Sequence, residues 1–294
     1  MMAASAARVT VTSRVSPLRR AKDRAFSVFL WACAAIALAP LVLIVAYVFT
    51  RGFSALSVNF FTKSPAGPLD PGSGGIAEAF LGTGLIVGMA ALFSTPLGVL
   101  TAVYLSEFGR GRMAAAVRFV AEILLSTPSI VAGVFIYAVV VTRMHGFSAL
   151  AGSIAISVLM WPVIARATEE VLRLVPQDLR EGALALGLPR WKVILRIVVP
   201  TAGAGILTAI MLALARGLGE TAPILITALG NDYINWNVGQ PTDAVPLRIY
   251  AYARGSVVAL QPFAWGGAIM LLLGVLILSI AARILSARQR RRTG

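Results

Sequence analysis

Long apolar runs constrain the fold of this chain more than any other feature of its sequence. Six of them are present, at about residues 28–49, 80–105, 119–141, 149–165, 198–229 and 263–284. An α-helix rises about 1.5 Å per residue, so roughly 20 apolar residues cross a hydrocarbon core of about 30 Å. The alternation of apolar and polar residues that marks membrane β-barrel strands is absent from these runs. The sequence therefore predicts an all-α polytopic membrane protein with six transmembrane helices.

The length or the ends of three runs carry further information about the fold. The first is too long for a signal peptide, and no small-residue cleavage site follows it. The run at 149–165 is short, and we expect its helix to end at Trp161-Pro162. The run at 198–229 is too long for one simple helix and contains Arg216 and Glu220. We therefore expect the last of these to be broken, tilted or partly outside the membrane.

Composition argues against the main alternative classes. Hydrophobic residues make up 58% of the 294 residues and charged residues only 13%, whereas about half of a soluble domain is apolar. The single cysteine, Cys33, excludes an intramolecular disulfide and a cysteine-based zinc site. The single histidine, His145, argues against a histidine-rich metal centre and a Ser-His-Asp triad. We therefore expect no metal and no bound cofactor in this chain.

The basic excess, a formal net charge of +14, reports orientation in the membrane. Lys and Arg accumulate in the cytoplasmic loops of membrane proteins. Twenty of them lie in the two tails and in the loops after the second and fourth runs, against five in the remaining loops. This asymmetry predicts that both termini are cytoplasmic. It also removes the need for a nucleic-acid partner, and membrane lipid is the expected surrounding.

The runs and the segments between them predict four regions. Residues 1–25 form a basic cytoplasmic tail, and residues 26–73 form an accessory first transmembrane helix with an external loop. Residues 74–285 form a core of five transmembrane helices, which includes a long cytoplasmic loop at 166–200, and residues 286–294 form a second basic tail. Glycines recur in the second run, where small residues predict close helix packing; they are Gly82, Gly84, Gly88 and Gly98.

The loop at 166–200 predicts a short amphipathic helix. Pro176 and Asp178 are typical of a helix start, Gly187 of a helix end, and Pro189 blocks continuation. Such a helix, projecting from a membrane domain, can dock into a soluble partner. The chain has no phosphate-binding loop of the GxxxxGK[ST] type, so it does not bind ATP by that device.

The same loop resembles the EAA loop of ABC-importer permeases. The matching residues, with the family's spacing, are Glu181, Gly182, Ala183, Gly187, Ile197 and Pro200. Gly182 stands where the family usually has a second alanine, and Val199 where it usually has leucine. The resemblance implies a coupling helix that sits in a cleft of a cytoplasmic ATPase. ATP would then be hydrolysed by a separate subunit, and this chain would not be an enzyme.

Arg216 and Glu220 are the ionisable residues that matter most. They lie four residues apart, within pairing reach on one helical face. Charges inside a membrane are costly, face the protein interior and often mark a pathway. An arginine fork suits phosphate, and Glu220 would neutralise Arg216 or compete with an anion for it. The pair predicts a substrate path or gate; a structural ion pair or an extramembrane helix cap is the alternative.

The segment around this pair resembles phosphate-uptake ABC permeases, and further motifs match the A-type member of their permease pair. The matching segments are residues 74–76, 82–83, 95–98, 104–107, 128–133 and 219–223. The resemblance implies a type I ABC importer permease fold and a multi-pass protein of the bacterial cell membrane. The implied partners are a related second permease in a heterodimer, two ATPase subunits and an extracytoplasmic phosphate-binding protein.

The predicted function is phosphate import by ATP-driven alternating access. Import of another oxyanion or small solute is one alternative. An ion-driven secondary transporter working alone is another, and the EAA-like loop speaks against it. A membrane anchor or sensor without transport would leave the Arg216–Glu220 pair without a reason. The aromatic residues of the external loop at 231–262 predict either an interfacial belt or a surface that receives the binding protein.

Overall fold

The computed structural model describes residues 17–66, 70 and 72–293, and the side chains up to residue 287. Arg8 and Arg14 of the predicted N-terminal tail, and the arginines at 288–292 of the C-terminal tail, have side chains outside this description. Within it the chain is helical, and an isolated bridge between Leu229 and Thr242 is the one β-type pairing. Five helices are long and apolar enough to cross a membrane, or six if one bent pair counts as a span. The all-α polytopic fold is thus confirmed.

The chain divides into two units, residues 1–47 and 48–294. The described part of the first unit belongs to helix α1 (Pro17–Gly52), which contains the expected first span. A proline is favourable in the first helical turn, where its missing N–H has no partner to lose. The helix therefore begins inside the segment expected to be a tail, and only residues 1–16 of that tail lie outside the described chain.

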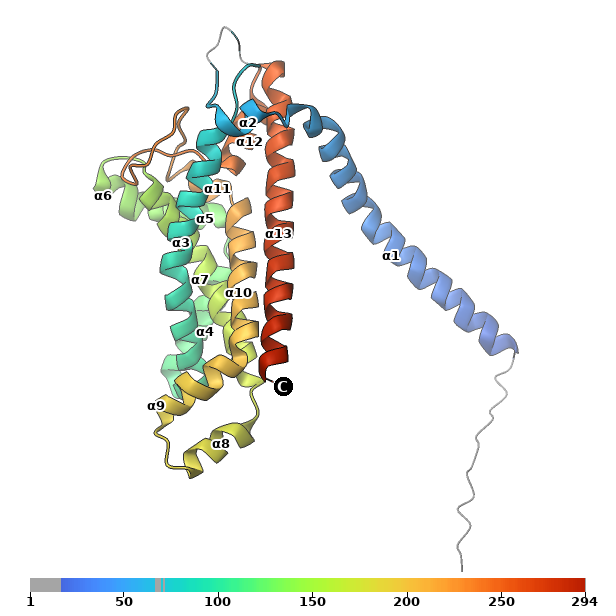
Figure 1. Ribbon diagram of the computed structural model, residues 1–294, viewed down its shortest axis with the longest axis vertical. Coiled ribbons are helices and arrows are strands. Elements are labelled where there is room, and N and C mark those ends of the chain that lie inside the picture. The colour runs from blue at the N-terminus through green and yellow to red at the C-terminus, as the bar shows by residue number, and fades with distance from the viewer. Residues whose placement is uncertain (1–16, 67–69, 71, 294) are drawn as a thin grey trace, which may run out of the picture. The chain divides into compact units, whose positions relative to one another are not determined.

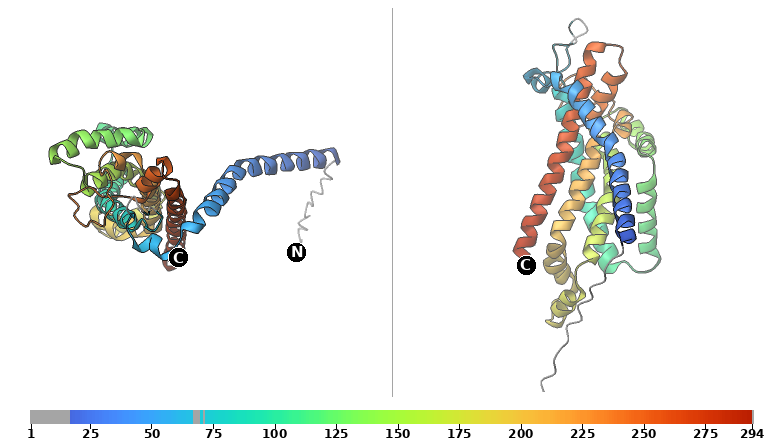
Figure 2. Two further views of the ribbon diagram at one scale, coloured as in Figure 1. Left: turned by 90° about the horizontal axis from the view of Figure 1, so that it is seen from above. Right: turned by 90° about the vertical axis from the view of Figure 1, so that its right-hand side faces the viewer.

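The second unit is a bundle of helices (Figures 1 and 2). Its long helices are α3 (Ala77–Val103), α4 (Gly111–Ser126), α7 (Ala149–Arg173), α10 (Val199–Gly219) and α13 (Gln261–Thr293). Shorter helices are α2 (Val58–Thr62), α5 (Ser129–Ile136), α6 (Thr142–Met144), α8 (Gln177–Ala185), α9 (Arg190–Val193), α11 (Ala222–Leu225) and α12 (Val245–Arg254). The π-helical turns are η2 (Tyr104–Phe108), η3 (Tyr137–Val141) and η4 (Ile194–Val198), and the 3-10 turns are η1 (Phe53–Ala55) and η5 (Val258–Leu260).

Helix α7 lies at the centre of the bundle. It packs against α3, α4 and α10, and α13 packs against the other side of α10. Two thirds of the apolar stretch of α7 is buried (67%), against 33% for α3 and α10. The main core cluster joins α7 to α3, α10 and α11 through residues that include Ile86, Ile156, Met160 and Ile224. Its large aliphatic side chains hold the central helices together.

Two smaller clusters close the ends of the bundle. Phe60, Ile76 and Phe263 pack together where α2 and α12 meet α13. At the opposite end, Leu172 and Val198 pack near α8 and α9, and Figure 1 shows these two ends clearly. The coupling-type loop and the segment before α12 therefore lie at opposite ends of the second unit.

The expected end of the fourth span at Trp161-Pro162 is wrong. Helix α7 contains Pro162 in its interior and continues to Arg173. A proline costs one backbone hydrogen bond and some steric strain. Neighbouring helices allow a transmembrane helix to tolerate this, and Pro162 is buried among them. The long loop expected at 166–200 is shortened accordingly, because α7 and η4 occupy both of its ends.

The third span is also corrected, because residues 119–141 do not form one straight helix. Helices α4 and α5 are bent by 107° at a break of a few residues. Thr127 has ψ 132° and Pro128 also lies outside the helical region. A proline disfavours the α conformation for the residue that precedes it, so Thr127-Pro128 turns the chain at this point.

The glycines of α3 fall into two classes. A Cβ at Gly82 would lie 1.9 Å from the carbonyl oxygen of Asp243, and one at Gly98 would lie 2.7 Å from Cγ2 of Ile164. In contrast, no described atom of the second unit lies within 4 Å of a Cβ built at Gly84 or Gly88. The predicted packing role is thus confirmed for Gly82 and Gly98 and is wrong, within this unit, for the other two.

These two classes predict opposite effects of an added methyl group. Gly82→Ala forces the backbone of residues 242–243 away, and overpacking of this kind costs about 1–3 kcal/mol. The matched control, Gly84→Ala, adds helix propensity of up to ~1 kcal/mol without a clash. Thermal unfolding of the detergent-purified chain should show a lower midpoint for Gly82→Ala only. Equal losses in both variants would contradict the packing assignment.

Candidate functional site

Arg216 and Glu220 lie where helix α10 ends. The helix stops at Gly219, Glu220 is extended (φ −73°, ψ 123°), and the short helix α11 follows. Nε of Arg216 and Oε1 of Glu220 are 3.3 Å apart. The sequence prediction of a pair and of a break in this span is therefore confirmed in geometry, while its role in transport stays a prediction.

The sequence explains why the helix stops here. Gly217 and Gly219 weaken it, because glycine loses more backbone freedom in a helix than other residues do. Gly217 also packs closely on α7, since a Cβ there would lie 3.0 Å from Sδ of Met160. Pro223 then begins a new helical segment, in which its missing N–H costs nothing.

A second break lies beside the first. Helix α5, which follows the turn at Pro128, packs directly on α11: a Cβ at Gly133 would lie 2.7 Å from Cα of Pro223. Inside a membrane, irregular backbone is tolerated only where it is buried in protein or lines a water-filled cavity. Discontinuous helices form substrate sites in other transporters for this reason. Two adjoining breaks therefore make this region the candidate substrate path.

The Arg216 side chain is 36% exposed in this chain, and that of Glu220 is 14% exposed. An arginine that faces lipid near the middle of a bilayer is strongly disfavoured. Arg216 lies three residues before the end of the 21-residue helix α10, where water or another protein chain is a more favourable surrounding for its open side than lipid. A partly open guanidinium held by one carboxylate can exchange that partner for an incoming anion.

The residues of the EAA-like loop occupy helix α8 and its flanks. Glu181, Gly182 and Ala183 lie on α8, which begins and ends close to the predicted residues. Gly187, at φ +81°, takes the left-handed conformation that ends a helix. Pro200 lies apart from them, in the first turn of α10. The predicted short helix and its end at Gly187 are thus confirmed, while the role of these residues in docking stays a prediction.

Helix α8 presents a mixed outer surface. Glu181 and Gly182 are exposed, whereas Ala183 is buried and attaches the helix to the bundle. Apolar side chains beside them are also exposed, with Leu186 at 84% and Trp191 at 56%. Exposed apolar residues clustered around a short helix are typical of a protein docking surface.

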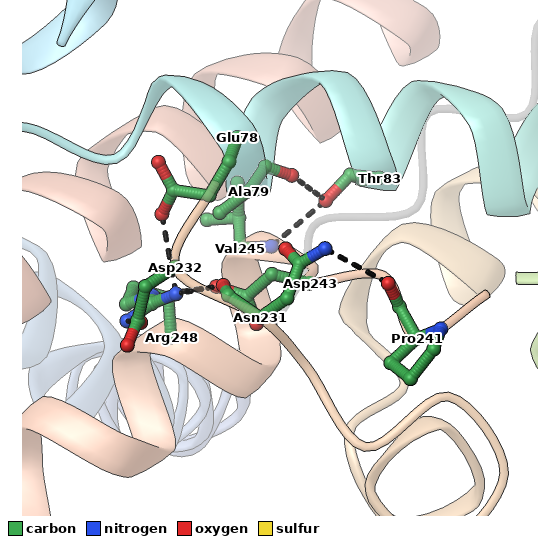
Figure 3. A network of polar contacts seen from close by, with 9 residues as sticks. All are labelled: Glu78, Ala79, Thr83, Asn231, Asp232, Pro241, Asp243, Val245 and Arg248. Carbon is green, nitrogen blue, oxygen red and sulfur yellow. Dashed lines mark hydrogen bonds and ion pairs between the residues drawn. The ribbon is translucent and has the colours of Figure 1, made fainter. Parts of the chain in front are cut away.

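A buried ionic cluster lies at the end of the bundle that contains α12, and the sequence did not predict it (Figure 3). Arg248 of α12 is its centre, with Nε 2.5 Å from Oδ2 of Asp243 and Nη1 2.7 Å from Oδ1 of Asp232. Nη2 lies 3.2 Å from Oε1 of Glu78 on α3 and donates to the carbonyl of Asn231. The side chains of Arg248, Glu78 and Asp243 are at most 9% exposed. One arginine thus joins α3, α12 and the segment before α12.

Further hydrogen bonds fix the same segment. The hydroxyl of Thr83 donates to the carbonyl of Ala79 and accepts from the N–H of Val245, each at 2.8 Å. The side-chain amide of Asn231 donates to the carbonyl of Pro241 (Figure 3). The loop at 231–243 is therefore held in one conformation by contacts at both of its ends.

Burial shifts the titration of this cluster. Desolvation raises the pKa of Asp243 to about 6, although the charge of Arg248 opposes the shift. Desolvation lowers the pKa of Arg248, but Asp243 and Asp232 outweigh it, so the net pKa is raised and the guanidinium stays charged. Among the described residues, no group of three His, Cys, Asp or Glu side chains could hold a metal ion. Arg248 is therefore the counter-charge that these carboxylates depend on.

The sequence contained one signal for this cluster. Arg248 interrupts the otherwise apolar and aromatic residues around it, and Glu78 begins an apolar run. A charge in such a setting requires a partner when it is buried. The partners themselves are far apart in the sequence, so their identity was not accessible from it.

Replacing Arg248 should strongly destabilise the chain. Arg248→Met leaves Glu78 and Asp243 buried without a counter-charge, which costs about 3–5 kcal/mol. Arg254→Met is the matched control on the same helix, because Arg254 is exposed and contacts the ring and hydroxyl of Tyr250. Thermal unfolding in detergent measures the difference.

The stability lost in Arg248→Met should depend on pH. A raised pKa means that the folded state binds the Asp243 proton more tightly than the unfolded state, so this carboxyl favours folding at low pH and disfavours it as pH rises. Arg248 lowers the pKa of Asp243, so its removal raises that pKa further, and the penalty of Arg248→Met should be smaller at about pH 5 than at about pH 8. A penalty that does not change with pH, or equal losses in the control, would contradict this account.

Comparisons with known proteins agree with this geometry. A family model described as "Binding-protein-dependent transport system inner membrane component" matches residues 94–291. The phosphate transport system permease protein PstA of Haemophilus influenzae is 44% identical over 236 residues, which cover 80% of this chain and 83% of the relative. PstA 1 of Mycobacterium tuberculosis is 40% identical over 281 residues, covering 93% and 91%.

Solved structures share the fold at low sequence identity. A chain of a bacterial alginate ABC transporter, solved with a periplasmic protein that holds an alginate pentasaccharide, has a TM-score of 0.66 at 15% identity. The alignment covers 93% of this chain and 98% of the other. A chain of the MetNI methionine ABC transporter has a TM-score of 0.57 at 18% identity, covering 72% and 93%. At these identities the likeness concerns the fold alone.

Proposed function

This chain belongs to the family of binding-protein-dependent transport system inner membrane components, and from that premise we propose that it is the permease subunit of an ATP-driven phosphate importer. The PstA relatives, 40–44% identical over most of this chain, support phosphate as the substrate. The apolar helices and the family place the chain in the inner membrane as a multi-pass protein.

The observation that carries the phosphate assignment within the molecule is Arg216 at the broken end of α10. Its guanidinium offers paired donors that match two phosphate oxygens, and it stays charged at any relevant pH. Glu220, 3.3 Å away, occupies the guanidinium when no anion is present. Phosphate must displace this carboxylate to bind, so the pair serves both as a site and as a gate.

The alternative role for this pair is structural. A partly exposed arginine beside two helix breaks favours the path. A different oxyanion would satisfy the same guanidinium, so competition by sulfate distinguishes phosphate import from that second candidate.

We propose partners for each end of the bundle. Helix α8 docks on one of two cytoplasmic ATPase subunits, so this end of the second unit faces the cytoplasm. The excess of Lys and Arg in the two tails supports a cytoplasmic position for both termini. The outer end receives the phosphate-binding protein, and exposed Tyr233 and Trp236 on the fixed loop at 231–243 supply apolar contacts for it. A related second permease covers the open side of Arg216 and completes the path. ATP binding and hydrolysis then swing the two permeases against each other.

Replacing Arg216 tests the path directly. In the complete transporter reconstituted in liposomes, Arg216→Gln should reduce ATP-dependent uptake of radiolabelled phosphate to background, because glutamine has no charge to offer the anion. Excess unlabelled phosphate, but not sulfate, should compete in the wild type. Arg143→Gln is the matched control, since Arg143 is exposed on α6 and distant in sequence from the break at Glu220.

The double variant Arg216→Gln/Glu220→Gln separates the two roles of the pair. If the pair were only structural, this double variant would recover uptake, since it removes both charges together. Normal uptake by Arg216→Gln alone would exclude the path. Loss of the ATPase from purified Arg216→Gln complexes would instead indicate a folding defect.

Gly187 tests the docking of α8. Valine is strained at φ +81°, by roughly 1–2 kcal/mol, so Gly187→Val should distort the end of α8. We expect less ATPase subunit to copurify and less uptake per transporter. Gly182→Ala is the control, because no described atom lies within 4 Å of a Cβ built there and the family usually has alanine at this position. Normal copurification and uptake by Gly187→Val would argue against the docking assignment.

A further inference from the structure

The cytoplasmic end of α3 carries an unusual concentration of negative charge. The helix continues through the π turn η2 to Phe108. The last carbonyls of a helix lack intrahelical donors and carry the negative end of the helix dipole. Glu107 adds a carboxylate there, with a side chain only 6% exposed. An arrangement of this kind requires cations from outside the helix.

Three arginines supply those cations, each from a different element. Arg118 of α4 donates Nη2 to the carbonyl of Leu105 at 2.8 Å. Arg180 of α8 places Nη2 3.1 Å from Oε1 of Glu107. Arg190 of α9 donates to the carbonyl of Glu107. We name these three residues the arginine collar of α3.

The collar links α8 to α3 through side chains. A cavity of about 330 Å³ separates the two elements, lined by Ser106 and Gly109 on one side and by Gln177 and Leu184 on the other. The Arg180–Glu107 pair bridges this region. The same Nη2 of Arg180 also donates to the carbonyl of Leu172 at the end of α7, at 2.7 Å. Arg180 therefore connects α8 to both α3 and α7 by charged contacts.

From the collar, the helices reach both ends of the candidate path. Arg118 also pairs with buried Glu169 of α7 at 2.9 Å, and its own helix α4 ends at the break at Pro128. Helix α3 runs from the collar to Glu78, which the Arg248 cluster holds at the outer end. The collar is thus connected through α4 to the α4–α5 break and through α3 to the outer loop.

We propose that the arginine collar couples movement of α8 to α3 and α4, so that its loss separates ATP hydrolysis from transport. This inference rests on the proposed function. Glu107, Arg180 and Arg190 act as positioning residues and do not touch substrate. Coupling between sites is a free-energy difference that must be measured. The diagnostic quantity is therefore the amount of phosphate imported per ATP hydrolysed.

The experiment uses the complete transporter in liposomes with phosphate-loaded binding protein. ATP hydrolysis and radiolabelled phosphate uptake are measured on the same preparation, and copurified ATPase reports assembly. In Glu107→Gln and Arg180→Gln we expect hydrolysis to continue while phosphate imported per ATP falls about fivefold or more. The controls are Glu170→Gln and Arg166→Gln, which break an exposed pair on α7 of similar length, 3.0 Å, and should keep the wild-type ratio.

Each outcome decides between the roles. If hydrolysis and uptake fall together at a constant ratio, the collar is only structural and the proposal is overturned. A normal ratio of phosphate imported to ATP hydrolysed in both Glu107→Gln and Arg180→Gln overturns it as well. Should Glu107→Gln yield no complex, Arg190→Gln decides by the same ratio, because it changes an exposed residue. A wild-type transporter without ATP-dependent phosphate uptake would overturn the proposed function itself, before any variant is compared.

Discussion

Lipid offers no hydrogen-bond partner to the backbone, and the structure depends on this constraint. Each long apolar segment therefore folds as a helix that satisfies its own N–H and C=O groups. Where a helix is interrupted, the free groups must lie inside the protein or face water. The breaks at Thr127-Pro128 and at Glu220 obey this rule by lying on adjoining elements, α5 and α11. The same constraint that builds the bundle thus marks the candidate substrate path.

The buried charged side chains follow a related rule, because each of them needs a counter-charge. Arg248 neutralises carboxylates at the outer end of α3, and Arg180 does so at the inner end. Arg216 is different, because one carboxylate satisfies it only in part and its side chain stays 36% exposed. Buried ion pairs are costly to form and more costly to break. The chain thus has one buried ion-pair cluster at each end of α3 and one partly exposed pair where α10 ends.

Local signals predicted what depends on neighbouring residues. The ends of α8 follow from Pro176 and Gly187, and the Arg216–Glu220 pair follows from a spacing of four residues. Rules of the same kind failed where packing outweighed them. Pro162 does not end α7, because burial among three helices compensates for one lost hydrogen bond. At Pro128, by contrast, the chain turns by 107° where the apolar pattern alone indicated a straight span.

The sequence by itself determined the membrane class, the approximate spans, the short helix α8 and the charged pair in the fifth span. These depend on hydropathy and on spacings within a few residues, which a linear pattern contains. Tertiary structure alone decided that Gly82 packs while Gly84 does not, that Arg248 meets Glu78, and that Arg180 meets Glu107. These partners are distant in the chain, and only the packing of α3 against its neighbours brings their side chains within contact distance.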